Sequence, residues 1–320
     1  MTLAATAIVV THNSARHIEA SLAALCEAGL DVRVVDNASC DGTAELIMRN
    51  FPAVSVTVNA TNVGFARAVN QALPEVTRET VLLVNPDAVV PPETVFGLLQ
   101  HLTEHPAVGV AGPRLVDEQG QAAISAHPFE TLSSVLASRF GGGLLPVSIR
   151  RRFSGAARRA AYDACLGSAG ETRRATSVDW LSGACLAVRT DLLRSLGGLD
   201  ERYFLYYEDE ELCLQARRRG ADVVYLPALQ AVHAGGASSE LGATWPHLYR
   251  SMLVFFSRHR RSSFSAVRAA ILVRALVGVG LAAVRTLLRD PTGTHRVKAW
   301  REVTVMVAAS TLRSLEMPSR

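Results

Sequence analysis

Short apolar runs alternate with longer amphipathic runs through the first hundred residues of this 320-residue chain. The apolar runs TAIVVTH, DVRVVDN, VSVTVN and TVLLVN have the composition of strands. Helix-like runs lie over residues 15–26, from about residue 44 and over residues 64–73, with Ser14 as the expected N-cap of the first. Repeated strand–helix units with short connections predict an α/β fold in which helices cover both faces of a parallel sheet.

Polar residues follow each of the four expected strands. They are Thr11-His12-Asn13, Asp36-Asn37, Asn59 and Asn62, and Asn85 with Asp87. The carboxyl ends of parallel strands meet at one edge of the sheet, and ligands of such folds bind beyond that edge. We therefore expect these four groups to converge on a ligand site.

The strand–helix pattern weakens at about residues 125–175, where glycine and arginine are frequent, and we expect an insertion there. Regular structure is expected again in SVDWLSGACLAVR, a strand-like run interrupted by Gly183, and in a helix over residues 190–196. YYEDEELCLQARRRG is acidic at its start and basic at its end, as the dipole of a helix favours. ADVVYLP is the next expected strand.

Composition restricts the class of protein. The chain is 49% hydrophobic and 19% charged, which is typical of a folded protein and excludes a disordered one. The N-terminal sequence lacks the basic start of a signal peptide, and no Cys-x-x-Cys pair predicts a disulfide framework or a zinc site. A reducing cytoplasm is the expected location, because the cysteines are scattered, at Cys26, Cys40, Cys165, Cys185 and Cys213.

The net charge of +4 is unevenly distributed. Residues 139–174 carry eight arginines against Asp163 and Glu171, and residues 250–320 carry thirteen lysines and arginines against three acids. The rest of the chain therefore has a net charge of −12. Basic segments on an acidic body indicate an anionic partner, either nucleic acid or a membrane. The few aromatic residues available for base stacking and the long apolar runs favour an anionic membrane surface and no nucleic acid.

Each acidic or imidazole side chain has an ordinary structural explanation when it is considered singly. Asp36 and Asp41 are of a type common in turns, residues 208–211 fit a solvated first helical turn, and His233 fits a packed or capping role. The order of these residues along the chain changes the interpretation.

Seven stretches, in order, resemble the family 2 glycosyltransferases, which have the nucleotide-diphosphosugar (GT-A) fold. They are VVTHNSARHIEASLAAL, VVDNASCDGT, NVGFARAVNQAL, LLVNPDAVV, WLSGACLAVR, GGLDERYFLYYEDEELCLQARRRG and AVHAGGAS, over about residues 8–238. NVGFA, NPD and RYFLYYED are most similar to bacterial rhamnosyltransferases that act on lipid-linked or envelope acceptors. The resemblance implies a central, mostly parallel sheet with helices on both faces and a C-terminal α-helical appendage outside the matched region.

The resemblance also implies a donor site with a divalent cation, Mg²⁺ or Mn²⁺, that would stabilise the charge of a leaving diphosphate. Asp87 fills the metal-binding position, although Asn85 stands where the family has the first carboxylate of an Asp-x-Asp pair, and His233 matches a further metal or diphosphate contact. The expected nucleotide-sugar residues are Thr11, Asn13, Asp36, Asn62, Gly64, Phe65, Arg67, Asn85 and Asp87.

Asp209 matches the family's catalytic base, which takes the proton of an acceptor hydroxyl. Its place at the start of a helix is expected to keep the carboxylate ionised unless burial opposes this. Glu208 is expected to orient Asp209 or to touch the acceptor, and Trp180 and Gly183 are expected to frame the acceptor cleft. The chain departs from the family's commoner Glu-Asp-x-Asp-Leu pattern, because Glu211 replaces the second aspartate.

Residues 263–288 predict a long helix near the end of the chain. Its longest uncharged run is the ten residues 275–284, well short of the roughly 20 that span a bilayer. Arg274, Arg285 and Arg289 fall within about 60° of one another around a helix of 3.6 residues per turn and leave a broad apolar face. The alternatives are a helix packed on the catalytic domain, an interfacial helix on anionic lipid, and a re-entrant or spanning helix.

We therefore expect a GT-A catalytic domain over residues 1–240 and a basic helical segment over residues 241–320 that associates with the membrane. Within that segment, residues 300–312 are expected either to add to the membrane helix or to form an oligomer contact, such as that of a homodimer. The implied reaction is the inverting transfer of a sugar, with dTDP-L-rhamnose as the favoured donor and a polyprenyl-diphosphate-linked envelope glycan as the favoured acceptor. Alternatives are another donor, such as a UDP-hexose or UDP-galactofuranose, or a non-catalytic membrane-associated scaffold that binds sugar nucleotides. The expected location is the cytoplasmic face of the cell membrane, as a peripheral protein.

Overall fold

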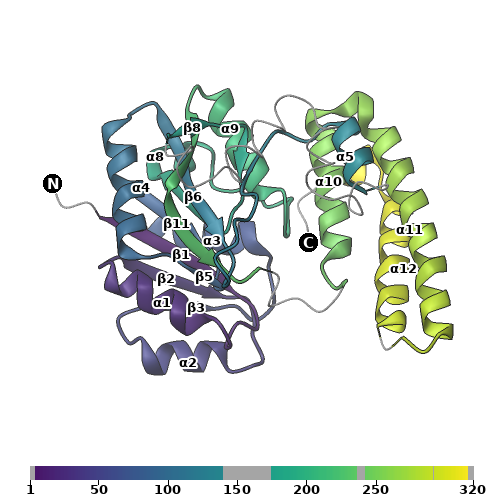
Figure 1. Cartoon of the computed structure of the whole chain (residues 1–320), viewed down its shortest axis with the longest axis horizontal. Coiled ribbons are helices and arrows are strands. Elements are labelled where there is room, and N and C mark those ends of the chain that lie inside the picture. The colour runs from purple at the N-terminus through teal and green to yellow at the C-terminus, as the bar shows by residue number, and fades with distance from the viewer. Residues whose placement is uncertain (1–3, 140–173, 236–241, 291, 316–320) are drawn as a thin grey trace. The chain divides into compact units, whose positions relative to one another are not determined.

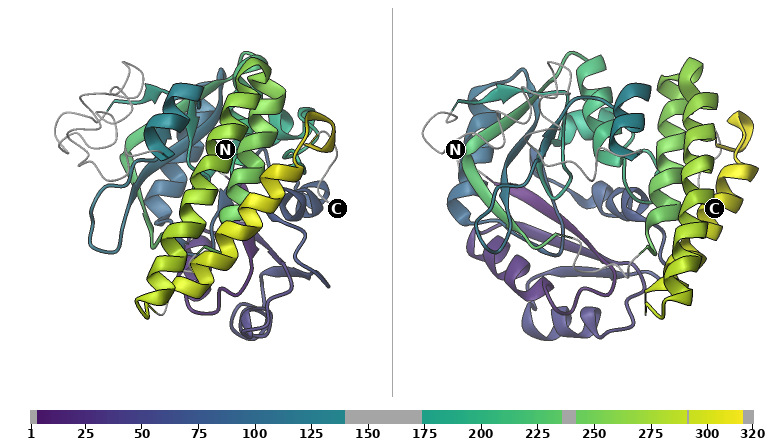
Figure 2. Two further views of the ribbon diagram at one scale, coloured as in Figure 1. Left: turned by 90° about the vertical axis from the view of Figure 1, so that its right-hand side faces the viewer. Right: turned by 45° about the vertical axis from the view of Figure 1, so that its right-hand side comes forward.

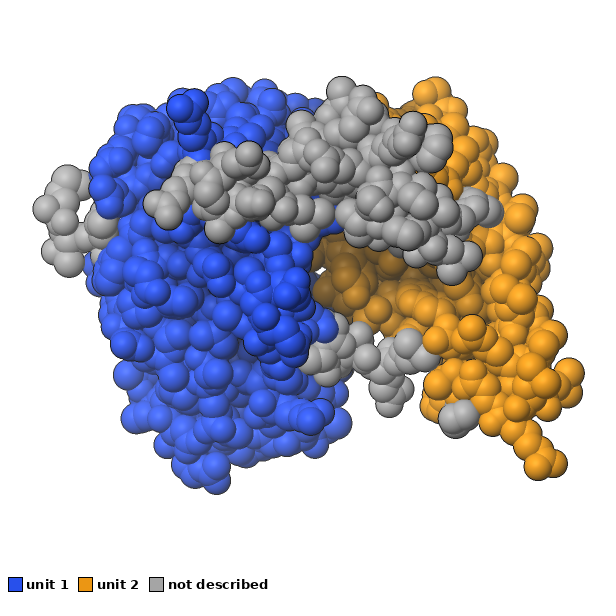
Figure 3. All heavy atoms as spheres, in the orientation of Figure 1, with its two compact units in different colours: residues 1–129, 154–200, 209–238 blue, residues 130–153, 201–208, 239–320 orange. Residues whose placement is uncertain are grey.

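The structure is a computed structural model that describes residues 4–139, 174–235, 242–290 and 292–315. Most of the insertion expected at residues 125–175 therefore lies outside the described residues. The chain divides into two compact units (Figure 3). Unit 1 comprises residues 1–129, 154–200 and 209–238, and unit 2 comprises residues 130–153, 201–208 and 239–320.

A nine-stranded sheet forms the centre of unit 1. Its strands lie in the order β3-β2-β1-β4-β10-β6-β11-β5, and β8 pairs with β11. The first four strands of the path are parallel, as the repeated strand–helix units predict, but β10 is antiparallel to both of its neighbours and makes the sheet mixed. The strands are β1 (Ala5–Thr11), β2 (Asp31–Asp36), β3 (Ser55–Val58), β4 (Thr80–Val84), β5 (Ala88–Val89), β6 (Val108–Val116), β8 (Thr176–Ser177), β10 (Cys185–Arg189) and β11 (Asp222–His233).

Helices cover both faces of this sheet (Figure 1). One face packs against α1 (Ile18–Glu27), α2 (Thr43–Asn50) and α4 (Pro92–Glu104). The other face packs against α3 (Phe65–Ala72), which a 3₁₀ turn η1 (Leu73–Glu75) continues, and against α8 (Thr190–Ser195) and α9 (Glu208–Arg218). Two hydrophobic cores therefore lie on opposite sides of one sheet.

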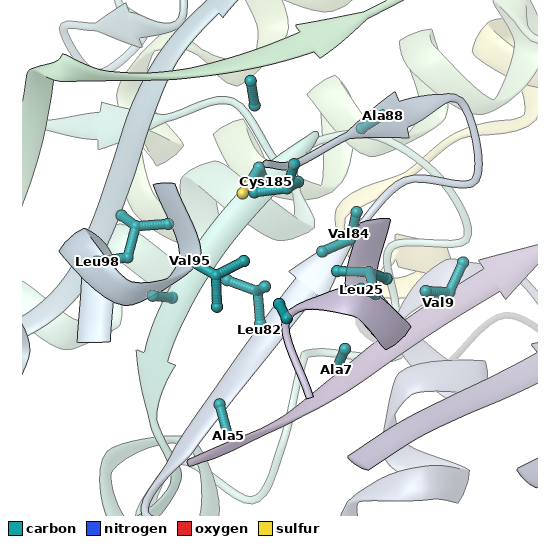
Figure 4. Packing of buried hydrophobic residues seen from close by; sticks show 14 of the residues in the cluster. Ala5, Ala7, Val9, Leu25, Leu82, Val84, Ala88, Val95, Leu98 and Cys185 are labelled. Carbon is teal, nitrogen blue, oxygen red and sulfur yellow. The ribbon is translucent and has the colours of Figure 1, made fainter. Parts of the chain in front are cut away.

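The alternation of side chains along a strand distributes residues between the two cores. In β4, Leu82 and Val84 point into the first core, together with Leu25 of α1 and Val95 and Leu98 of α4 (Figure 4). The intervening residues of β4 join the second core. Because both faces are buried, the central strands are apolar at nearly every position, and each large aliphatic side chain contributes roughly 1.5–3 kcal/mol to the free energy of unfolding.

Three local features differ from the sequence predictions. The prediction that Ser14 caps α1 is wrong, because its carbonyl accepts the N–H groups of His17 (3.0 Å) and Ile18 (3.1 Å), so residues 15–17 form a turn before the helix. Helix α4 and strand β6 had no sequence prediction, and α4 has a proline at its first turn, where a missing N–H is tolerated. The run around Gly183 is divided, since β9 (Trp180–Leu181) leaves the main sheet and pairs with β7 (Ala126–His127).

Unit 2 is helical in its described part. It contains α5 (Leu132–Arg139), α10 (Trp245–His259), a 3₁₀ turn η3 (Arg261–Ser263), α11 (Phe264–Leu287), α12 (Gly293–Ala309) and α13 (Leu312–Leu315). The long helix predicted near the end of the chain is thus observed as α11, which lies side by side with α12 (Figure 2). Trp300 of α12 is at the centre of the packing, 4.5 Å from the ring of Trp245, with the guanidinium of Arg274 over its ring at 5.4 Å.

Helix α11 has two different apolar faces. Val267, Ile271, Ala275, Gly278 and Ala282 are buried. The opposite face is exposed by 52–83%, at Val273, Leu276, Val277, Leu281, Val284 and Leu287, and we call it the exposed stripe of α11. The longest uncharged run of α11 is short, but the stretch Arg261–Leu287 is long and apolar enough to cross a membrane. No other helix in the described residues meets both conditions. Within its most apolar 18 residues, 28% are buried inside the protein.

Gly278 and Gly280 of α11 form a matched pair for testing the contact with α12. A Cβ at Gly278 would lie 2.5 Å from ring atoms of Trp300, whereas a Cβ at Gly280 has no atom within 4 Å. We expect Gly278→Ala to lower the free energy of unfolding by roughly 1–3 kcal/mol through overpacking. Gly280→Ala should raise it by up to about 1 kcal/mol, because alanine is the better helix former. Urea unfolding followed by tryptophan fluorescence measures both, and equal effects would contradict the packing described here.

Candidate active site

The first group of site residues lies where β1 and β2 end. Thr11 and Asp36 are partners in the parallel register of these strands, and the Asp36 carboxylate is buried. It accepts hydrogen bonds from Thr11 Oγ1 (2.7 Å), Ser39 N (2.9 Å) and Ser39 Oγ (2.5 Å). Asn13 has a φ of 53° and joins the same loop, because its Oδ1 accepts the N–H of Cys40 (2.9 Å). The structure therefore brings together the three residues expected at the nucleotide pocket.

The second group lies in the loop between β3 and α3. Asn62 Oδ1 accepts the N–H of Gly64 (3.0 Å), and Asn37 Nδ2 donates to the carbonyl of Gly64 (3.2 Å). Gly64 has a φ of 87°, a conformation that favours glycine, and Phe65 begins α3 directly after it. Arg67 lies in the first turn of α3 with an exposed side chain. Asn37 thus connects this loop to the group around Asp36.

The third group is formed by Asn85, Asp87 and His233. Antiparallel pairing of β5 with β11 places His233 opposite Ala88. His233 Nε2 lies 3.3 Å from Asp87 Oδ1 and 3.4 Å from Asn85 Nδ2. Burial opposes ionisation of Asp87, but the contact with His233 and the charges of His233 and His17 outweigh it and lower the pKa of this carboxyl. Asp87 is therefore an anion at neutral pH, although its partner His233 stands 146 positions later in the sequence.

His17 belongs to the same region, although the sequence analysis did not single it out. One helical turn after it, Ser21 Oγ donates to the carbonyl of Asn85 (3.5 Å), so the start of α1 lies against the Asn85–Asp87 loop. The Nε2 atom of His17 is buried and has no hydrogen-bond partner among the described residues.

A divalent cation fits the third group of residues only with help from other ligands. The described residues contain no cluster of three or more His, Cys, Asp or Glu side chains that could hold a metal ion. The ionised carboxylate of Asp87 and the imidazole of His233 supply two donors, and Asn85 supplies a neutral amide. Mg²⁺ is commonly bound through one or two carboxylates while phosphate oxygens and water complete its coordination, so the single carboxylate of Asp87 fits a cation that a diphosphate also ligates.

The fourth group surrounds Asp209 in the first turn of α9. Asp209 Oδ2 accepts the N–H of Gly183 (2.9 Å), and Oδ1 accepts the N–H of Glu210 (2.8 Å). Part of Asp209 remains accessible, but burial of its carboxylate outweighs these hydrogen bonds and raises its pKa. The expectation that the helix start keeps Asp209 ionised is thus opposed by burial. Glu208, the first residue of α9, is buried.

Trp180 precedes Gly183 by three residues and stands on β9. Its ring stacks on that of His127 at 4.2 Å, and its Nε1 donates to the carbonyl of Pro128 (3.1 Å). Sequence reasoning missed His127, because 53 positions separate it from Trp180 and only the β7–β9 pairing brings the two rings together.

All four groups lie at the same edge of the sheet of unit 1. The order β3-β2-β1-β4-β10 makes most of the strands beside these groups consecutive neighbours, and His233 comes from β11, which pairs with β5. Because β10 is antiparallel, its first residues, and not its last, lie at the carboxyl ends of β1 and β4. The N–H of Asn85 donates to the carbonyl of Ala184 (3.0 Å) and joins the Asp87 group directly to the Gly183–Asp209 group. The polar groups that follow β1, β2, β3 and β4 thus lie at one edge of the sheet, as predicted, and the Gly183–Asp209 group, which that prediction did not include, lies there too.

Comparison with known proteins identifies the family. A family model described as glycosyltransferase-like family 2 matches residues 4–265 of the chain. The chain belongs to glycosyltransferase-like family 2. It is 29% identical over 240 residues to an N-acetylglucosaminyl-diphospho-decaprenol L-rhamnosyltransferase of Mycobacterium tuberculosis. The matched region covers 71% of this chain and 74% of that protein. The resemblance seen in the seven motifs is confirmed, and the chain is a glycosyltransferase enzyme related to rhamnosyltransferases.

Solved structures confirm the GT-A fold. The mannosyltransferase PcManGT from Pyrobaculum calidifontis, in complex with GDP-Man and Mn²⁺, is 18% identical with a TM-score of 0.51, covering 95% of this chain and 85% of its own. The first 349 residues of TarS from S. aureus, in complex with UDP-GlcNAc, are 17% identical with a TM-score of 0.51, covering 96% and 91%. A further structural relative, GalNAc-T7, was also solved with Mn²⁺, at a TM-score of 0.56 and 12% identity, covering 82% of this chain and 49% of that protein.

Proposed function

We propose that this family 2 glycosyltransferase moves L-rhamnose from dTDP-L-rhamnose to a hydroxyl of a polyprenyl-diphosphate-linked glycan, with inversion at the anomeric carbon. The observation that carries the proposal is the pair of carboxylates in different surroundings at one sheet edge, with Asp87 beside His233 and Asp209 bound by the N–H groups of Gly183 and Glu210. Different environments for two acids indicate different roles in one reaction. The choice of sugar and acceptor is supported by the name of the mycobacterial relative.

In this reaction Asp209 is the general base. It takes the proton from the acceptor hydroxyl while that oxygen forms a bond to the anomeric carbon, and the bond from this carbon to the diphosphate breaks on the opposite side. A carboxylate with a raised pKa holds the proton better than an ordinary aspartate does. The N–H groups of Gly183 and Glu210 hold the carboxylate in one orientation, so that its partly exposed surface faces the substrate.

The donor is held by the first three groups of residues. Thr11, Asn13 and Asp36 bind the nucleoside, and the loop from Asn62 to Arg67 covers the nucleotide and sugar. Asp87 and His233 would hold a divalent cation, which would stabilise the negative charge of the leaving diphosphate. Asn85 contributes a neutral ligand at most, so the diphosphate itself supplies much of the affinity for the cation.

The acceptor lies on the side of Trp180 and Gly183, with Glu208 beside the base. Trp180 and His127 form a stacked pair, and an aromatic face of this kind suits the apolar face of a sugar ring. Another donor, such as a UDP-hexose or UDP-galactofuranose, is the alternative within this reaction class. A scaffold that binds sugar nucleotides without catalysis is disfavoured, because it does not need a half-buried carboxylate with a raised pKa.

Incubation of the protein with a panel of nucleotide sugars, Mn²⁺ and a short-chain polyprenyl-diphosphate GlcNAc tests the function. We expect release of dTDP from dTDP-L-rhamnose and loss of turnover by roughly 10²- to 10⁴-fold in Asp209→Asn, because only the proton acceptor is removed. Affinity for dTDP should stay within a factor of about two. Release of UDP alone would support the alternative donors. No turnover with any nucleotide sugar would support the non-catalytic scaffold instead.

The pH dependence gives an independent check of Asp209. The base must be deprotonated, and its pKa is raised, so kcat should fall as the pH drops through this raised value and should do so at a higher pH than an ordinary aspartate would give. The pH profile of kcat is then measured for a variant that keeps some activity, such as Asp209→Glu. If its kcat falls at the same acidic pH as that of the wild type, the fall belongs to another group.

The cation site is tested by Asp87→Ala, with Asp222→Ala as the control. Asp222 is an exposed carboxylate at the other end of β11, the strand that carries His233. Calorimetric titration with dTDP should show at least about tenfold weaker binding for Asp87→Ala in Mn²⁺ and little change in EDTA. The control should match the wild type under both conditions. Equal effects of Asp87→Ala with and without Mn²⁺ would refute its role in metal binding.

We further propose peripheral attachment to the cytoplasmic face of the membrane through the exposed stripe of α11, with no helix crossing it. Residues 250–320 carry thirteen basic residues, which attract anionic lipid. A spanning position is disfavoured because α11 packs along α12, which exposes Lys298, Arg301 and Glu302. These charges would enter the hydrocarbon core together with α11, at a high cost. Homodimer formation stays a prediction.

Charged substitutions in the exposed stripe test this attachment. Leu276→Glu with Leu281→Glu should weaken binding to phosphatidylglycerol-containing vesicles at least about tenfold, since apolar burial is lost and negative charge is added. Val305→Glu is the matched control, because Val305 is 70% exposed on α12 outside the stripe. Vesicle sedimentation measures both variants. Equal binding by wild type and double variant would refute the stripe as the lipid surface, and resistance of the wild type to carbonate extraction would indicate a spanning helix.

A further inference from the structure

The turn directly before the catalytic pair has an unusual backbone conformation. Tyr206 and Tyr207 have φ values of 69° and 71°, and they are consecutive. Residues other than glycine rarely adopt this left-handed region, because it is strained for a residue with a Cβ atom. Two adjacent aromatic residues in this state persist only if the surrounding structure holds them there.

Residues of unit 2 supply contacts along this segment. The ring of Phe204 stacks on His247 at 4.4 Å, and Ser251 Oγ donates to the carbonyl of Leu205 (2.9 Å). Tyr206 lies at the surface, where its hydroxyl donates to Thr244 Oγ1 (3.2 Å). These contacts attach the segment to α10 and to the residue before it, but none of them acts on Tyr207.

Tyr207 is held from two sides. Its ring is 7% exposed and lies 5.6 Å from the ring of Phe255 on α10. Its hydroxyl donates a hydrogen bond to Glu130 Oε2. Glu130 is half-buried and stands 77 positions earlier in the chain, just before α5. A hydrogen bond from a phenol to a carboxylate is among the stronger ones in proteins, because the acceptor is charged.

We propose that Glu130 is a positioning residue for the transfer reaction, which acts by holding Tyr207 so that Glu208 and Asp209 enter α9 in the productive orientation. The inference rests on the proposed role of Asp209 as the base. In the sequence only Glu208 separates Tyr207 from Asp209, so relaxation of the φ of Tyr207 redirects the first turn of α9. That turn contains the Asp209 carboxylate, whose direction is set by the N–H groups of Gly183 and Glu210.

The expected effect falls on turnover and not on donor binding. A displacement of a catalytic group by about 1 Å reduces a rate by as much as about 10²-fold. The nucleotide residues from Thr11 to Arg67 belong to other loops. Loss of the Tyr207–Glu130 hydrogen bond should therefore lower kcat and leave the affinity for dTDP unchanged.

The test compares Tyr207→Phe, Glu130→Ala and their double variant in the dTDP-release assay with the full chain. We expect each single variant to lower kcat about tenfold, and the double variant to be no slower than either, since one hydrogen bond is removed in all three. Glu130→Gln keeps an acceptor oxygen and should recover kcat to within about threefold of wild type. Tyr206→Phe is the matched control, with the same backbone conformation and an exposed ring, and should leave kcat within about twofold.

The outcomes separate this inference from the proposed function. If Asp209→Asn retains turnover, the proposed function fails first. If Asp209→Asn is inactive but Tyr207→Phe and Glu130→Ala keep wild-type kcat, the inference alone is wrong. Additive losses in the double variant, or losses of dTDP affinity equal to those in kcat, would show a general structural effect and overturn it. Thermal unfolding of the wild type, Glu130→Gln and Glu130→Ala is measured alongside, and a recovery of melting temperature by Glu130→Gln without recovery of kcat would also overturn it.

Discussion

The antiparallel insertion of β10 between β4 and β6 is the constraint on which the site depends. Pairing of Cys185 with Val84 brings the residues before β10 to the carboxyl ends of β1 and β4, where parallel strands alone would place only the loops that follow them. Gly183 then meets Asp209, and Ala184 meets the backbone of Asn85. A parallel β10 would carry Gly183 to the opposite edge of the sheet and would separate the two acids.

The two aspartates show how one sheet edge can support two kinds of chemistry. Asp87 is more deeply enclosed than an ordinary turn residue, yet His233 and His17 favour its ionised form and lower its pKa. Asp209 has backbone N–H donors but no cation beside it in the described residues, so burial prevails and raises its pKa. The difference lies in the neighbours and not in the residue type, because contact with two histidines offsets desolvation where two backbone hydrogen bonds do not.

Much of the fold could be predicted from the sequence, because apolar periodicity reports local structure directly. The four parallel strands and the convergence of Thr11, Asp36 and Asp87 follow from repeated strand–helix units. The antiparallel direction of β10 could not be predicted in this way, since strand direction depends on the connection and not on the side chains. The stacking of His127 on Trp180 and the bond from Tyr207 to Glu130 depend on partners 53 and 77 positions apart, for which one sequence carries no signal.

The capped carboxylate of Asp209 also bears on the order of substrate binding. A half-buried carboxylate with a raised pKa gains most from a hydrogen-bond donor that arrives in place of water. In the reaction proposed above, an acceptor hydroxyl would be such a donor, and the contact that stabilises the ionised form of Asp209 would also place the hydroxyl proton where the base removes it. Ionisation of the base and positioning of the acceptor are then linked, because each makes the other more favourable. In the absence of acceptor, water is a competing nucleophile, and an aspartate whose pKa is raised is less often ionised to activate it. Under the proposed role of Asp209 as the base, the burial that opposes its ionisation would therefore favour transfer to the acceptor over hydrolysis of the donor.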